Sequence, residues 1–118
     1  MGNEIISKEL LSEVLNLNMW KTETLTISTE YNKLYYNGIT LGDYGYYEYT
    51  EHINIHELAH KCKEWAKNKG YVIGVDLDKV NIWSIKEREV INHYEVYWED
   101  YLEFEFRACQ WILESKKD

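Results

Sequence analysis

The sequence predicts an α+β domain in which three helices pack on an antiparallel sheet of four or five strands. Two observations support this class. Apolar residues recur with helical spacing behind capping residues in three segments, and stretches of alternating apolar and polar residues lie between those segments. Because 118 residues are enough for one hydrophobic core, we expect a single layered domain over 1–118.

The first two helices each have clear boundary signals. Ser7 is a suitable N-capping residue for a helix over 7–15. Asn54 caps the start of a central helix over 54–69, Glu57 completes a capping box, and Gly70 ends the helix after two lysines. This central helix is the strongest structural signal in the sequence.

The last helix is predicted over 100–116. Asp100 and Glu103 repeat the capping-box pattern, and the apolar residues beyond them keep a helical period. Residues 102–106 also alternate as a strand would, and a helix places Glu105 close to the apolar side. We favour the helix because the capping pattern and the downstream period agree.

Strands are expected on both sides of the central helix. Before it, 22–29 and 33–36 predict two strands joined by a turn. Asn37-Gly38 and Gly42-Asp43 are turn signals, so we interpret residues 44–49 as a loop. The three strands predicted after the helix cover 71–77, 80–85 and 90–98.

The apolar positions of these elements predict the core. It should contain Leu10, Val14, Leu58, Cys62, Ala66, Ile73, Ile82, Cys109 and Leu113. The two cysteines form no C-x-x-C motif and no signal peptide is recognisable, so we expect buried thiols and a reduced, cytoplasmic setting. No apolar run reaches the roughly 18 residues of a membrane-spanning helix. We therefore expect no membrane association.

The charge and the aromatic content favour a protein partner. A net charge of -8 disfavours direct binding to nucleic acid, which depends on neutralising phosphates, and favours a partner with a basic surface. The chain has 5 Trp and 11 Tyr but only 2 Phe. Tyrosine and tryptophan combine apolar area with a polar tip, which suits either a sheet surface or a protein interface.

One motif has the spacing of a zinc site. His56, Glu57 and His60 form H-E-x-x-H, in which two histidines bind the metal and the glutamate acts on its water. However, both histidines lie away from the apolar stripe, Glu57 already serves in the capping box, and only Glu64 or the distant His93 could add a ligand. We therefore expect no metal, no other cofactor and no catalytic residue.

The segment between Gly38 and Glu51 is the predicted contact surface. It holds tyrosines and acids in what we interpret as a loop, and functional residues concentrate on loops that rigid elements hold. The expected partner-binding residues are Asp43, Tyr44, Tyr46, Tyr47, Glu48, Tyr49 and Glu51.

Three segments carry a resemblance to a known family: S-K-E-L-L-S-E-V-L-N near the start, I-N-I-H-E-L-A-H-K-C-K-E-W-A-K-N-K-G-Y in the middle, and F-R-A-C-Q-W-I-L near the end. Together they resemble small phage and prophage proteins of the phage ABA sandwich kind. The resemblance implies a phage origin and layered helices with an antiparallel sheet, and it carries over no catalytic residue. Compact acidic phage proteins also resemble inhibitors of bacterial defence systems, including anti-CRISPR proteins.

The sequence leaves several functions open. The favoured one is a non-enzymatic phage protein that binds and inhibits a host defence protein, with acidic residues standing in for phosphates at a basic nucleic-acid-binding surface. A zinc-dependent hydrolase using the H-E-L-A-H motif is an alternative, as is a module that binds a small ligand or nucleotide. A structural role in the phage particle is also open.

Overall fold

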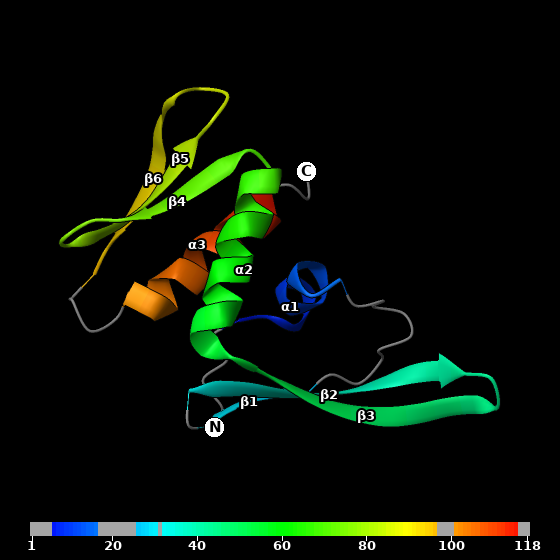
Figure 1. Ribbon diagram of the computed structural model, residues 1–118. Coiled ribbons are helices and arrows are strands. Elements are labelled where there is room, and N and C mark those ends of the chain that lie inside the picture. The colour runs from blue at the N-terminus through cyan, green and yellow to red at the C-terminus, as the bar shows by residue number, and fades with distance from the viewer. Residues whose placement is uncertain (1–5, 17–25, 31, 97–100, 116–118) are drawn as a thin grey trace. The chain divides into compact units, whose positions relative to one another are not determined.

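The computed structural model describes residues 6–16, 26–30, 32–96 and 101–115 (Figure 1). In chain order its elements are α1 (Lys8–Val14), β1 (Thr26–Glu30), β2 (Lys33–Gly42), β3 (Gly45–Asn54), α2 (Ile55–Asn68), β4 (Tyr71–Val75), β5 (Lys79–Ser84), β6 (Glu89–Glu95) and α3 (Tyr101–Ser115). The predicted α+β class is confirmed.

The described strands form two sheets, not the one sheet of four or five strands that we expected. Both are antiparallel and three-stranded, with the orders β1-β2-β3 and β4-β5-β6. The chain divides into two compact units, Met1–Leu58 and Ala59–Asp118, and the division falls inside α2. Each unit contains one sheet, because the strands before α2 pair only with one another and so do those after it.

In the first unit, α1 is capped as predicted. The backbone N–H of Leu10 donates to the Ser7 hydroxyl over 3.0 Å, and Leu10 and Leu11 are fully buried. Val14, which we expected in the core, is only half-buried. It is the last residue of the helix, where the chain turns and the buried face ends.

The first sheet differs from the prediction at the first of the two expected turns, Asn37-Gly38, whereas the turn expected at Gly42-Asp43 is present. Asn37 and Gly38 lie within β2, paired with Thr50 and Tyr49 of β3. The hydroxyl of Thr50 donates to Asn37 Oδ1 over 2.8 Å, so the asparagine serves a cross-strand pair instead of a turn. The chain reverses only after Gly42, and residues 45–49, predicted as loop, are strand. Residues 22–25 of the first predicted strand lie outside the described residues.

The central helix α2 follows β3 directly and begins as predicted. Asn54 Oδ1 accepts from the backbone N–H groups of His56 and Glu57 over 2.8 and 3.2 Å. Gly70 ends the helical segment with a φ of 99°, which glycine adopts without a Cβ clash. Leu58 and Cys62 are fully buried, as expected of the apolar face.

In the second unit, α3 contacts all three strands of the second sheet. The buried side chains of α3 are Glu105, Phe106, Ala108, Cys109, Ile112 and Leu113. They recur with helical period, so the helical interpretation of 102–106 is confirmed. The sheet contributes Ile73, Val80 and Ile82, all buried. Asp100 of the predicted capping box lies outside the described residues.

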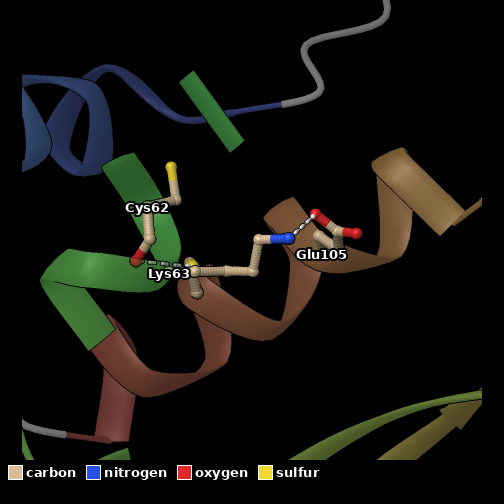
Figure 2. Close-up of polar contacts among 4 residues, drawn as sticks. Cys62, Lys63 and Glu105 are labelled. Atoms are coloured by element: carbon tan, nitrogen blue, oxygen red, sulfur yellow. Dashed lines mark hydrogen bonds and ion pairs between the residues drawn. The ribbon is translucent and has the colours of Figure 1, made fainter. Parts of the chain in front are cut away.

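Glu105, which the sequence placed close to the apolar side, is buried at 8% exposure and pairs with a lysine of α2. Figure 2 shows Lys63 reaching toward it, with Nζ 3.2 Å from Glu105 Oε2. The nearby Cys109 thiol donates to the carbonyl oxygen of Cys62 over 3.4 Å. These contacts join α2 to α3 and explain how a carboxylate is accommodated beside the core, since a buried charge needs a partner.

Both cysteines are free and buried, as predicted. The hydrogen bond with Cys62 and burial raise the pKa of the Cys109 thiol far above its ordinary value. The thiol is therefore protonated at neutral pH and is a poor nucleophile. Among the described helices, none combines the length and the apolar character needed to cross a membrane.

Candidate protein-binding site

The predicted contact residues lie on one long β-hairpin. Among the described residues, β1 pairs with β2 from Glu30↔Lys33 to Thr26↔Asn37, and β2 and β3 pair with each other from Lys33↔Asn54 to Gly42↔Gly45. We call residues 38–49, the part of this β2–β3 hairpin that ends in the turn, the hairpin arm. Figure 1 shows β2 and β3 running side by side to their connecting turn. The arm contains all the predicted contact residues except Glu51, which lies at its base.

The strand pleat divides these residues between two faces. Successive side chains of a strand point to opposite sides, so Tyr47, Tyr49 and Glu51 share one face of β3 and Tyr46 and Glu48 share the other. Asp43 and Tyr44 lie in the turn. In the loop expected from the sequence, all seven residues could lie on one surface. The hairpin instead distributes the strand residues over two faces.

The face that carries Tyr47, Tyr49 and Glu51, which we call the tyrosine face, packs its rings on glycines of β2. A Cβ added at Gly38 would lie 2.5 Å from Cζ of Tyr49, and one added at Gly42 would lie 2.6 Å from Cε1 of Tyr47. The tyrosine rings therefore occupy the space that a side chain at position 38 or 42 would fill. This packing adds to the stability of the hairpin arm.

The tyrosine face continues into the core of the first unit. Tyr36, directly opposite Glu51, is 9% exposed, and Leu34 pairs with Ile53 one step further along the same face. Burial, with contributions from Glu51 and Tyr49, raises the pKa of Tyr36 above its ordinary value of 10.0. The base of the arm is therefore anchored by buried side chains.

The opposite face is polar near its base. The rings of Tyr35 and His52 lie 5.6 Å apart, and the Asn37–Thr50 hydrogen bond follows one step along. Tyr46 and Glu48 continue this face toward the turn and are exposed. Tyr46 and Glu48 therefore add an aromatic ring and a negative charge to this face.

The arm combines exposed aromatic area with exposed acids. Tyr44 is fully exposed, and Tyr46 and Tyr47 are 59% and 58% exposed. No lysine or arginine occurs in the sequence between Lys33 and Lys61, so Asp43, Glu48 and Glu51 have no basic neighbour along the chain. Such a surface suits binding to a basic partner, since tyrosine supplies contact area and the acids supply attraction.

The glycine beneath Tyr49 permits a direct test of this packing. In Gly38→Ala the new Cβ takes the place of the Tyr49 ring, which is the end of a flexible side chain and can swing away. We expect a loss of stability below about 1 kcal/mol, with a clear change in the chemical shifts of the Tyr49 ring protons. Gly74→Ala is the matched control, because a Cβ there meets nothing within 4 Å. Unchanged Tyr49 shifts in Gly38→Ala would contradict the packing.

The H-E-x-x-H residues are exposed and do not form a ligand set. His56, Glu57 and His60 all face solvent, and His60 Nε2 lies 3.6 Å from Glu64 Oε1. Among the described residues, no group of three or more His, Cys, Asp or Glu side chains is placed to hold a metal ion. The backbone N–H of Glu57 serves the helix cap, as the capping interpretation predicts.

We expect the double variant His56→Ala, His60→Ala to keep the stability and the partner binding of the parent protein. Both side chains are exposed, so their truncation removes little packing. Metal analysis of the purified protein should find less than stoichiometric zinc. Stoichiometric zinc that the double variant loses would show that the motif binds metal after all.

The two-face arrangement and the buried position of Tyr36 were not predicted from the sequence. The signals were present: Gly42 and Gly45 bracket a short turn, and Tyr47, Tyr49 and Glu51 alternate like a strand. No protein-family model, curated protein or solved structure matches this chain significantly.

Proposed function

We propose that this protein is a non-enzymatic binding protein whose hairpin arm docks on a basic surface of another protein. Its partner in this proposal is a host defence protein with a nucleic-acid-binding groove, and the protein is a phage-encoded inhibitor acting in the cytoplasm of an infected bacterium. The resemblance of the three sequence segments to small phage proteins supports the phage and anti-CRISPR-like part of the proposal.

The observation that carries the proposal is the composition of the arm. Its three exposed tyrosines and its exposed acids lie together on one β-hairpin. Exposed aromatic rings favour nonspecific association, so a group of them on a surface indicates that the surface is used for binding. Tyrosine is also among the residues that dominate binding energy at protein interfaces.

The two faces of the arm suggest how it would enter a groove. A two-stranded β-ribbon fits inside the major groove of DNA, so it is narrower than a duplex, and a protein groove that accepts a duplex has room for it. Once inside, Tyr47 on one face and Tyr46 on the other would contact opposite walls, while the acids meet lysine and arginine side chains. Inhibition then follows from occupying the groove.

Affinity isolation from a bacterial host lysate tests this function. We expect the parent protein to retain a basic partner at low ionic strength, to release it as salt is added, and to be displaced by the nucleic acid that the partner binds. The double variant Tyr46→Ala, Tyr47→Ala serves as the control bait and should retain much less of that partner. A partner held equally by both baits, or displaced by neither salt nor nucleic acid, would contradict the proposal.

A further inference from the structure

A second candidate binding surface lies in the unit Ala59–Asp118, between α2 and the open edge of β4. A groove of about 550 Å³ is lined there by His60, Lys63, Glu64, Lys67, Asn68, Val72 and Ile73. Its helical wall is polar and its strand wall is apolar. β4 is the edge strand of its sheet, and no described strand pairs with its outer side.

The backbone of β4 has hydrogen-bonding groups that point away from the sheet. The Gly70 carbonyl accepts from the Ile85 N–H, and the Asp76 N–H donates to the Lys79 carbonyl, so the even-numbered positions face β5. Because antiparallel strands alternate bonded and outward positions, Ile73 and Val75 direct their N–H and C=O groups to the open edge. An unpaired edge of this kind is a template for a further strand.

The helical wall contributes two lysines within an acidic protein, since Lys63 and Lys67 line the groove. From Ala59 to Lys69 the sequence has four lysines and one glutamate, whereas the whole chain has a net charge of -8. Two of the charged side chains lining the groove are already engaged: Lys63 pairs with Glu105, and Glu64 lies near His60. Lys67 has no ion-pair partner among the described residues. It lines the groove as an available cation.

We propose that this groove binds an extended acidic peptide segment of another protein, which adds to β4 as a fourth strand. The outward N–H and C=O groups of Ile73 and Val75 supply the backbone hydrogen bonds. Alternate peptide side chains face α2, where an aspartate or glutamate meets Lys67, and Val72, 40% exposed, contacts apolar groups of the segment. This surface is independent of the hairpin arm and selects the opposite charge.

Selection of a display library of random peptides on the immobilised full-length protein tests the proposal. We expect the enriched peptides to be acidic and rich in β-branched residues at alternate positions. Their binding should fall about fivefold in Lys67→Glu. It should also fall about fivefold or more in Val75→Pro, which removes one outward donor. Proline is tolerated on an edge strand where the N–H faces outward, so this variant should keep the fold.

Two matched controls separate the groove from general effects. Lys61→Glu makes the same charge change on α2 at an exposed residue that does not line the groove, and Val75→Thr keeps the outward N–H. Both should bind the selected peptides within about twofold of the parent. The circular dichroism spectrum of each variant establishes that it is folded.

The proposal is overturned if no acidic peptide is enriched, or if the selected peptides bind Lys67→Glu and Val75→Pro as tightly as the parent. It is also overturned if the protein alone forms a dimer that Val75→Pro dissociates, because a second copy then occupies the edge. Amide shifts provide a further check. The peptides should perturb the N–H signals of Ile73 and Val75 and leave those of the hairpin arm unchanged.

Discussion

Replacing Asp43, Glu48 and Glu51 together with lysine should slow association with the basic partner by about tenfold or more at low salt. The three acids are exposed and have no lysine or arginine nearby in the sequence, so they dominate the local field of the arm. The salt dependence of the association rate should flatten in the same variant. Stopped-flow or surface-based kinetics at several ionic strengths measure both effects.

The matched control makes the same change in net charge at three acids outside the hairpin arm. Glu87, Glu89 and Glu95 are exposed acids in and beside β6, outside the hairpin arm. Their replacement with lysine should change the association rate by less than about threefold, because these acids lie in or beside the other sheet and are no part of the proposed contact surface. If the arm variant and this control behave alike, net charge alone steers binding and the contact surface is not the arm.

Truncating Phe106 to alanine should lower the free energy of unfolding by about 3–5 kcal/mol, because a fully buried aromatic side chain leaves a cavity. Phe106 is completely buried in α3. Denaturant unfolding followed by circular dichroism measures the change.

Phe104→Ala provides the comparison for this prediction. Phe104 is half-buried, with its ring 5.9 Å from that of Tyr94 and 5.0 Å from the Arg107 guanidinium carbon. Its truncation should cost less than about 2 kcal/mol. In a strand, Phe104 and Phe106 would share one face and their truncations would cost similar amounts, so equal losses would contradict the helical assignment of this segment.

The helices could be predicted well because their signals are local. Each predicted range, 7–15, 54–69 and 100–116, ends within one residue of the observed bounds of α1, α2 and α3. Ser7 and Asn54 accept the backbone hydrogen bonds expected of N-caps, and Gly70 adopts the positive φ expected after a helix. Capping and periodicity depend on residues a few positions apart, which a single sequence displays directly.

The hairpin arm differs from the predicted loop because Gly38 serves side-chain packing and not a turn. Asn37-Gly38 lies inside β2, whereas the turn expected at Gly42-Asp43 is present, and both Gly38 and Gly42 make room for tyrosine rings from β3. That packing depends on a register between strands, which local composition does not reveal. The same limitation explains the sheet count, since which strands pair is decided by tertiary contacts and not by the alternation within each strand.

The predicted contact residues lie on a β-hairpin and not in the loop that the sequence led us to expect. Tyr44, Tyr46, Tyr47 and Glu48 are exposed as a contact surface requires. The strand pleat nevertheless separates Tyr46 from Tyr47, which a loop would not do. Lys63 and Glu105, distant in sequence, are joined only by the packing of α2 on α3, and no local pattern indicates that pair.

Hydrogen exchange of the protein with and without its partner tests the central claim most directly. β3 has no described strand on its outer side, so its outward-facing backbone amides should exchange readily in the free protein. In the complex we predict strong additional protection across residues 43–51, with little change in the amides of α1 and α3. Protection confined to other segments, with the arm exchanging as in the free protein, would contradict the assignment of the arm as the binding surface.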